Sequence, residues 1–339
     1  MSKIKNIVVT GGAGFIGSSF IKHMLSKASF SGNLVNYDLL TYAANLKYLE
    51  QEEKDSRYHF IQGNINDQST VSSICQDYQI DTIINFAAET HVDNSIIGPN
   101  HFMDTNIMGV FNLLEVVRKF PHIHLHQVST DEVFGSLGEE GEFNEESLYR
   151  PNSPYAASKA AADHLIRSYA NTYGLSLGLS YCSNNFGPGQ HGEKFIPVVI
   201  SCCVEQRPIP IYAKGQNIRE WLYVEDHVEA LWTILNSNKR KEIFAIGGGE
   251  QKRNIDIVKT VIELLSQKLS VKKEQFESLM TFVTDRPGHD YRYALNASKI
   301  EKELGWACRV PFADGLDQTV DWYLEVLLKD QKNIINPVI

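Results

Sequence analysis

Two carboxyl groups and a hydroxyl stand together at the end of a β-branched run. The stretch "VSTDEVFG" (128–135) places Thr130, Asp131 and Glu132 side by side before a glycine. Burial and mutual repulsion can push the pKa values of two close carboxyls apart, so that one is protonated and the other ionised near neutral pH. Such a pair suits a reaction that needs a general acid and a general base, whereas two solvated loop acids would have no chemical role.

A tyrosine and a lysine with helical spacing form a second candidate group. In "SPYAASKAAADHL", Lys159 follows Tyr155 by four residues, and none of the other tyrosines has a lysine at that spacing. On a helix both side chains share one face, where the ammonium can lower the pKa of the phenol. A plain surface helix is the better explanation of the pair in isolation, so its role depends on what lies beside it.

A glycine-rich turn is the third candidate group, and it indicates what could lie beside the Tyr/Lys pair. "VVTGGAGFIGS" places Gly11, Gly14 and Gly17 in a GxxGxxG pattern between a strand and an amphipathic helix, and Asp38 ends the next strand. Such glycines let the backbone approach a pyrophosphate, and an acid at the second strand binds ribose hydroxyls and favours NAD over NADP. A tyrosinate beside NAD is suited to removing a hydroxyl proton while hydride leaves the same carbon.

These groups require a parallel sheet to position them. Short β-branched runs separated by helix-length segments predict an α/β fold with a Rossmann-type doubly wound parallel sheet. We expect a NAD-binding domain over residues 1–184, with later segments returning to it, and a smaller mixed α/β substrate-binding lobe over 185–339. The runs lie at residues 6–10, 33–38, 58–65, 81–88, 124–130 and 176–184.

Composition excludes several classes of protein. The 339 residues are 43% hydrophobic with a net charge of −9, which favours a globular chain and argues against a nucleic-acid surface. No apolar run reaches the length of a membrane span and no signal peptide is present, so we expect a cytoplasmic protein without a membrane partner. The five cysteines and eleven histidines have no metal-binding spacing, so we expect reduced thiols and no metal.

The motifs of the chain also resemble a known family. Over about residues 4–325 the chain is similar to the dTDP-glucose 4,6-dehydratases of the extended short-chain dehydrogenase/reductase family. The glycine turn and the Tyr/Lys pair are shared by many nucleotide-sugar enzymes, whereas the Thr-Asp-Glu triplet and "DRPGHD" are narrower. The resemblance rests on "VTGGAGFIGS", "YDLLTYAANL", "NFAAETHVDNSI", "VSTDEVFGS", "SPYAASKAAAD", "CSNNFGP", "EKFIP", "NIREWLYVEDH" and "DRPGHDYRYA".

The resemblance implies a reaction and a role for each catalytic group. The sugar of a nucleotide-diphosphate sugar is oxidised at C4, loses water across C5 and C6, and is reduced at C6, so that NAD ends as it began. By this resemblance Tyr155, paired with Lys159 and helped by Thr130, is the base for the C4 hydroxyl. Glu132 removes the C5 proton and Asp131 protonates the departing C6 hydroxyl. The product would feed rhamnose or other deoxysugars.

The resemblance also implies two sets of binding residues. We expect a homodimer in which helices near 103–119 and 154–172 pack across a two-fold axis. The expected cofactor-binding residues are Gly11, Gly14, Phe15, Ile16, Gly17, Asp38, Asn64, Ile65, Ala87, Ala88, Tyr155 and Lys159. The expected substrate-binding residues are His91, Asn185, Glu193, Lys194, Arg219, Arg286 and His289, with Arg292 adding positive charge for the diphosphate.

Departures from the family pattern leave alternatives open. Tyr181 stands where arginine is expected, and Glu250 stands where asparagine is expected near the nucleotide. The loss of a cation and the gain of an anion leave UDP open in place of dTDP, and hence a UDP-sugar 4,6-dehydratase. A nucleotide-sugar 4-epimerase is a second alternative, although it has no obvious use for two acids. A NAD-sensing module without catalysis is the third.

Overall fold

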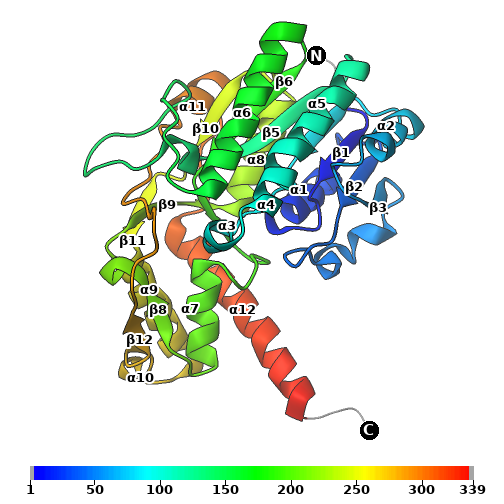
Figure 1. Cartoon of the computed structure of the whole chain (residues 1–339). Helices are drawn as coiled ribbons and strands as arrows, with labels where there is room; N and C mark the ends of the chain where they lie inside the picture. The colour runs from blue at the N-terminus through cyan, green and yellow to red at the C-terminus, as the bar shows by residue number, and fades with distance from the viewer. Residues whose placement is uncertain (1–3, 336–339) are drawn as a thin grey trace.

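The computed structural model describes residues 4–335 and has a parallel sheet at its centre (Figure 1). Within these residues, seven strands pair in the order β10, β6, β5, β4, β1, β2, β3, and every pairing is parallel. The predicted Rossmann-type sheet is therefore confirmed. The strands are β1 (Ile7–Thr10), β2 (Leu34–Asp38), β3 (Tyr58–Gln62), β4 (Thr82–Asn85), β5 (His124–Thr130), β6 (Leu177–Cys182) and β10 (Ile243–Ile246).

Helices cover both faces of the sheet, because successive strand residues point to opposite sides. In β1, Ile7 and Val9 belong to the core under α1 and α8, whereas Val8 belongs to the core under α2, α5 and α6. Figure 1 shows α5 and α6 side by side on the second face. The helices of this lobe are α1 (Phe15–Ser26), α2 (Gln68–Asp77), α3 (Val92–Ile97), α4 (Asn100–Phe102), the π-helical η3 (Met103–Gly109), α5 (Val110–Lys119), α6 (Pro154–Tyr173), α8 (Val224–Leu235) and α11 (Ser298–Leu304).

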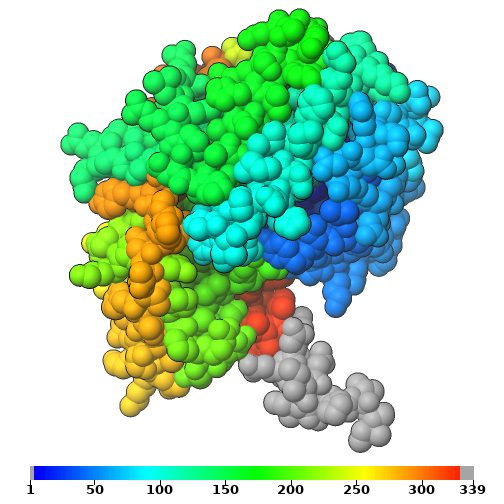
Figure 2. Space-filling view, viewed as in Figure 1, coloured from blue at the N-terminus to red at the C-terminus, as the bar shows by residue number. Residues whose placement is uncertain are grey.

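A smaller lobe lies below one end of the sheet, at the lower left of Figures 1 and 2. It contains two small sheets and a core of its own, in which Phe186, Trp221 and Ile262 are buried. Its strands are β7 (Asn184–Phe186), β8 (Ile209–Ile211), β9 (Ile218–Tyr223), β11 (Glu250–Arg253) and β12 (Met280–Phe282). Its helices are α7 (Phe195–Val204), α9 (Asn254–Leu269), α10 (Lys273–Glu277) and α12 (Phe312–Ile335).

The chain passes between the lobes more than once. After β9 in the smaller lobe, α8 packs against α1, and β10 pairs with β6 at the edge of the large sheet. The chain then returns to the smaller lobe at β11, and α11 packs against β10. Within residues 4–335, no helix is long and apolar enough to cross a membrane, and no group of three or more His, Cys, Asp or Glu side chains is arranged to hold a metal ion.

Candidate active site

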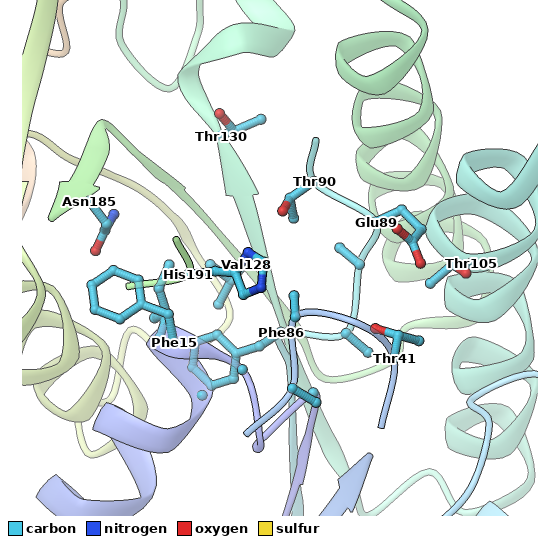
Figure 3. A pocket seen from close by; sticks show the side chains of 18 of the residues that line it. Phe15, Thr41, Phe86, Glu89, Thr90, Thr105, Val128, Thr130, Asn185 and His191 are labelled. Atoms are coloured by element: carbon cyan, nitrogen blue, oxygen red, sulfur yellow. The ribbon is translucent and has the colours of Figure 1, made fainter. Parts of the chain in front are cut away.

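A cavity lies where the strand order changes direction. From β1 the sheet extends through β2 and β3 on one side, and through β4, β5 and β6 on the other. The loops that leave the carboxyl ends of β1 and β4 therefore diverge and leave a crevice between them. The cavity there has a volume of about 310 Å³. Figure 3 shows Phe15, Thr130 and Asn185 around it, each from a different element.

The glycine turn after β1 forms a cradle, a closely packed turn in which Gly11 and Gly17 leave no room for a Cβ atom. Gly11 has φ +70°, and a Cβ added to it would lie 2.6 Å from the backbone nitrogen of Ala87. A Cβ on Gly17 would lie 2.3 Å from the carbonyl oxygen of Gly11. No side chain caps the N-terminus of α1, so its first N–H groups are free to bind an anion. These residues fit the pyrophosphate of a dinucleotide.

Asp38 lies at the carboxyl end of β2, where an adenosine ribose would bind. The side chain is 7% exposed, and it accepts hydrogen bonds from the backbone N–H groups of Ala13 at 2.9 Å and Leu40 at 2.8 Å. Burial raises the pKa of Asp38, while these two N–H groups lower it. Its oxygens keep lone pairs for ribose hydroxyls, and a carboxylate here would repel a 2′-phosphate.

All the predicted cofactor-binding residues line this one cavity. They come from the turn after β1, the first turn of α1, the end of β2, the loops after β3 and β4, and α6, which are far apart in the sequence. The residues are Gly11, Gly14, Phe15, Ile16, Gly17, Asp38, Asn64, Ile65, Ala87, Ala88, Tyr155 and Lys159.

Tyr155 and Lys159 lie in the first turns of α6, on the cavity wall. The helix begins at Pro154, and the Ser153 side chain caps it by accepting a hydrogen bond from the N–H of Ala156 at 3.1 Å. The Lys159 ammonium donates to the Val128 carbonyl at 2.8 Å, which ties α6 to β5. Burial lowers the pKa of Lys159 and raises that of Tyr155 well above its usual value. A cationic neighbour must therefore favour the phenolate if Tyr155 is to act as a base.

Thr130 joins the end of β5 to the two acids of the triplet. β5 ends at Thr130, and the 3₁₀ turn η4 (Asp131–Phe134) follows it. The Thr130 hydroxyl donates to Asp131 Oδ1 at 3.2 Å and accepts from the N–H of Glu132 at 3.3 Å. Thr130 and Glu132 line the cavity, whereas Asp131 is 2% exposed and lies behind them. Its Oδ2 atom is buried and has no hydrogen-bond partner among the described residues.

The two carboxyls of the triplet have different electrostatic surroundings. Burial raises the pKa of Asp131 well above its usual value, and the charges of Glu132 and Glu220 raise it further. Burial also raises the pKa of Glu132, but the three cations Arg286, Arg219 and Lys194 oppose this shift. Asp131 is therefore suited to be the acid and Glu132 the base.

The predicted substrate-binding residues divide into two groups. Asn185, Glu193 and Lys194 line the cavity beside Glu132. The Lys194 ammonium donates to the Thr90 carbonyl at 3.0 Å and to its hydroxyl at 3.2 Å, which fixes the cation across the cavity from β5. His91, Arg219, Arg286 and His289 lie outside the cavity lining.

The residues outside the lining have partners in the protein. Arg219 donates to the carbonyls of Ile218, Tyr291 and Asp290 at 2.8–3.3 Å. Arg286 donates to Asp93 at 3.3 Å, and His289 contacts Asp285 at 2.6 Å. His91 accepts from the N–H of Asn94 at 3.3 Å. Arg292 donates to the carbonyls of Gly138 at 3.3 Å and Gly141 at 3.1 Å. In this structure Arg219 and Arg292 therefore support loops, while the charges of Arg219 and Arg286 still reach Glu132.

The departures at residues 181 and 250 do not face the cavity. Tyr181 is fully buried in β6, where its hydroxyl contacts the Tyr149 hydroxyl and accepts from Arg167 at 2.9 Å. Glu250 is exposed on β11 and pairs with Lys252 at 2.9 Å. Neither residue belongs to the cavity lining, and the expectation that they alter the diphosphate site stays a prediction.

Asn106 is a site residue that the sequence did not indicate. Its side chain accepts from the N–H of Glu89 at 2.9 Å, and donates to the Glu89 carbonyl at 3.0 Å and to Ser158 Oγ at 2.8 Å. This amide joins the loop after β4 to α6 and so fixes Glu89, which lines the cavity. Asn106 lies in the π-helical η3, and no periodicity in the sequence predicts such a turn.

Fold and site together define a dehydratase that acts on nucleotide sugars. Residues 8–319 match the family model described as GDP-mannose 4,6 dehydratase, and the chain belongs to this family. Within it, the chain is 45% identical to a dTDP-glucose 4,6-dehydratase of Haemophilus influenzae, over 94% of this chain and 98% of that protein. The resemblance to the dTDP-glucose 4,6-dehydratases is therefore confirmed.

Solved structures agree with this membership. A crystal structure of the dTDP-glucose 4,6-dehydratase DesIV from Streptomyces venezuelae, with NAD and TYD bound, has a TM-score of 0.88 and 40% identity over 94% of this chain and 97% of that one. The UDP-glucuronic acid 4-epimerase of Bacillus cereus has a TM-score of 0.84 but only 26% identity, over 95% of this chain and 99% of that one. The fold is thus common to both reactions, and the site must distinguish them.

Proposed function

We propose that this chain converts dTDP-glucose to dTDP-4-keto-6-deoxyglucose with NAD as cofactor. The observation that carries the proposal is the pair of adjacent carboxyls, Asp131 and Glu132, held in unlike surroundings beside Tyr155. A 4-epimerase needs the tyrosine and a hydroxyl partner, whereas loss of water also needs an acid and a base. The relatives that are 4,6-dehydratases of dTDP-glucose support the same reaction.

The cavity suits NAD along its whole length. The glycine cradle and α1 would hold the pyrophosphate, Asp38 the adenosine ribose, and Lys159 the nicotinamide ribose. When bound, NAD would accept hydride from C4 of the sugar and return it at C6. Asn64, Ile65, Ala87 and Ala88 would pack around the adenine and along the dinucleotide.

The oxidation at C4 requires that its hydroxyl lose a proton. Tyr155 would take this proton as a phenolate, and the Thr130 hydroxyl lowers the pKa of Tyr155 by hydrogen bonding to it. Lys159, one helical turn away, would stabilise the phenolate by its charge. The keto group formed at C4 makes the proton on C5 acidic.

The elimination then uses the two carboxyls. Glu132 would remove the C5 proton, and the electron pair would form the C5–C6 double bond as the C6–O bond breaks. Asp131 would protonate the departing hydroxyl, which leaves as water. The partly buried Lys194, with Asn185 and Glu193, would bind the nucleotide-sugar part of the substrate. Arg219, Arg286, His91 and His289 would shape this side of the site.

Incubation with dTDP-glucose and, separately, with UDP-glucose tests the proposal. Mass spectrometry reports the loss of one water, and absorbance in alkali reports the keto sugar. We expect conversion of dTDP-glucose, and a fall of about 100-fold or more in Glu132→Gln. The exposed control Glu140→Gln should retain wild-type activity.

The remaining outcomes would each point elsewhere. Water loss from UDP-glucose alone would indicate a UDP-sugar dehydratase, and a change of isomer without a change of mass would indicate an epimerase. Absence of reaction with both substrates would favour the non-catalytic NAD-sensing module.

We also propose a cytoplasmic homodimer, whose product feeds rhamnose or another deoxysugar. All five cysteines are free thiols and four of them are buried, which suits the reducing conditions of the cytoplasm. The outer side of η3 and α6 carries exposed apolar side chains, with Met108 and Tyr173 each 47% exposed, which supports an interface there.

A further inference from the structure

The stripe that carries Tyr155 and Lys159 continues along α6. Asp163 and Arg167 follow at the same spacing of four residues, so a phenol, an ammonium, a carboxylate and a guanidinium succeed one another. The proposed reaction uses the first two groups only. Asp163 is 0% exposed and lies outside the cavity lining, so its burial has no explanation in substrate or cofactor binding.

Asp163 is tied to the strand that carries the catalytic triplet. Its Oδ2 atom accepts a hydrogen bond from the hydroxyl of Ser129 at 2.6 Å, and Ser129 directly precedes Thr130 in β5. Its Oδ1 atom is buried without a hydrogen-bond partner among the described residues. A carboxylate with one free oxygen in the interior is costly unless a nearby positive charge compensates it.

Two tyrosines and an arginine enclose this carboxylate on its other side. The Tyr149 hydroxyl lies 3.4 Å from Asp163 Oδ2 and contacts the Tyr181 hydroxyl, to which Arg167 donates at 2.9 Å. Burial raises the pKa of Tyr149 and raises that of Tyr181 to about 12, so both phenols are neutral. The cations that act on Asp163 are therefore Lys159 and Arg167.

Few other groups stabilise the charged form of Lys159. Its ammonium donates to the Val128 carbonyl, and the groups that favour its charged form are the Asp163 carboxylate, which acts most strongly, and the Cys182 thiol. Charges act on one another more strongly in the interior than in water. Asp163 and Lys159 lie one turn apart on α6, and each thus favours the charged form of the other without forming a direct ion pair.

We propose that Asp163 is a positioning residue, a buried counter-ion that is fixed by Ser129 and keeps Lys159 charged beneath Tyr155. The role of the Tyr155 phenolate rests on the proposed function, although the interaction between Asp163 and Lys159 does not. Burial raises the pKa of Asp163 to about 7, so the carboxylate is ionised at mildly alkaline pH. Without it, Lys159 would lose its proton more readily and would no longer favour the Tyr155 phenolate.

The holoenzyme of Asp163→Asn tests this proposal through the ionisation of Tyr155. The phenolate is measured by its ultraviolet absorbance, as the difference between each protein and the same protein with Tyr155→Phe. We expect the midpoint of the Tyr155 titration to rise by about one pH unit in Asp163→Asn. A direct effect of the lost carboxylate on Tyr155 would lower the midpoint, so a lower or unchanged midpoint overturns the proposal.

Two further variants complete the test. Tyr149→Phe removes a longer hydrogen bond that lowers the pKa of Asp163 less than Ser129 does, and it keeps the carboxylate. Its Tyr155 midpoint should therefore rise by less than that of Asp163→Asn, and a rise equal to that of Asp163→Asn would show that packing is responsible. If Asp163→Asn does not fold, Ser129→Ala supplies the measurement. Ser129 lowers the pKa of Asp163, so its loss should raise the Tyr155 midpoint by a smaller amount, and no rise would overturn the proposal.

The absorbance measurement does not need a substrate. Turnover of dTDP-glucose by the wild type decides the proposed function, and the Tyr155 titration decides the role of Asp163. Either proposal can therefore be contradicted while the other one stands.

Discussion

At the scale of single residues, the neighbours of Asp131 and Glu132 distinguish the two carboxyls more than burial does. Asp131 is buried and Glu132 is partly buried, and burial raises the pKa of each. Glu132 faces the cavity among cations, whereas Asp131 lies behind Thr130 beside two acidic neighbours. The folded state therefore favours the protonated form of Asp131, and the cost of its charged form to stability can be measured.

Asp131→Asn should stabilise the protein at neutral pH while it impairs elimination. Because the pKa of Asp131 is higher in the folded state than its ordinary value of 3.8, the folded state binds more protons above that value, and stability falls as pH rises through this window. The uncharged amide removes this dependence. We expect a higher Tm than wild type, with a larger gain at neutral than at acidic pH, and a loss of about 100-fold or more in activity.

Differential scanning calorimetry over this pH range measures the gain. Asp77→Asn, at the exposed end of α2, is the matched control and should show no pH-dependent gain. An equal Tm difference at acidic and neutral pH would contradict the raised pKa of Asp131.

At the scale of elements, α6 carries the Tyr/Lys pair at one end and a glycine cap at the other. The helix ends at Gly174, which has φ +65°, and its N–H donates to the Ala170 carbonyl. A Cβ at this position would meet nothing within 4 Å. Any effect of a side chain here therefore comes from backbone conformation alone.

Gly174→Ala should lower the free energy of unfolding by about 1 kcal/mol, because an L-residue with a Cβ is disfavoured in the left-handed region. Activity should be unchanged, since the cap lies at the opposite end of α6 from Tyr155. Urea unfolding measures the loss, and Gly174→Asn should lose less because asparagine tolerates this conformation. An alanine variant as stable as the wild type would contradict the assigned cap.

The elements that the sequence predicted are those with a clear period or turn. The strands at residues 6–10, 33–38 and 124–130 match β1, β2 and β5 closely, because apolar runs and the following glycine or acid mark them. β10 was not predicted, since four residues inside a loosely patterned region give little periodicity. The π-helical turn at Asn106 also has no sequence signal.

Some site residues could be predicted from the sequence and others could not. The glycine turn and Tyr155 could be found because short motifs fix their geometry. The role of Arg219 could not be predicted, because the sequence around it does not show whether the guanidinium binds a ligand or backbone carbonyls. The sequence does not indicate Asp163, because an acid at helical spacing from a lysine is common on surfaces and only the fold buries it.

At the scale of the whole molecule, the proposed homodimer depends on the face that η3 and α6 present. Met108 is 47% exposed on this face, whereas Phe282 is 58% exposed on β12 in the smaller lobe. Two apolar side chains of similar exposure thus lie in different lobes. Only the first lies within the predicted interface.

Met108→Lys should convert the homodimer to a monomer, because each copy would bring a charge into a two-fold contact. Phe282→Lys should leave the dimer intact. Light scattering after size-exclusion chromatography measures both masses. A dimeric Met108→Lys variant, or a wild type that is already monomeric, would contradict the proposed interface.

The position of β10 sets an order of events during synthesis. The edge of the large sheet is completed only by residues 243–246, after the chain has already entered the smaller lobe. A nascent chain that has emerged from the ribosome as far as residue 184 therefore contains the glycine turn, the Thr-Asp-Glu triplet and the Tyr/Lys pair, but β6 still has an open edge. Such an edge can pair with other chains. The nascent chain thus carries all the proposed catalytic groups before the sheet that holds them is closed, and an open strand edge of this kind makes a folding intermediate prone to aggregation.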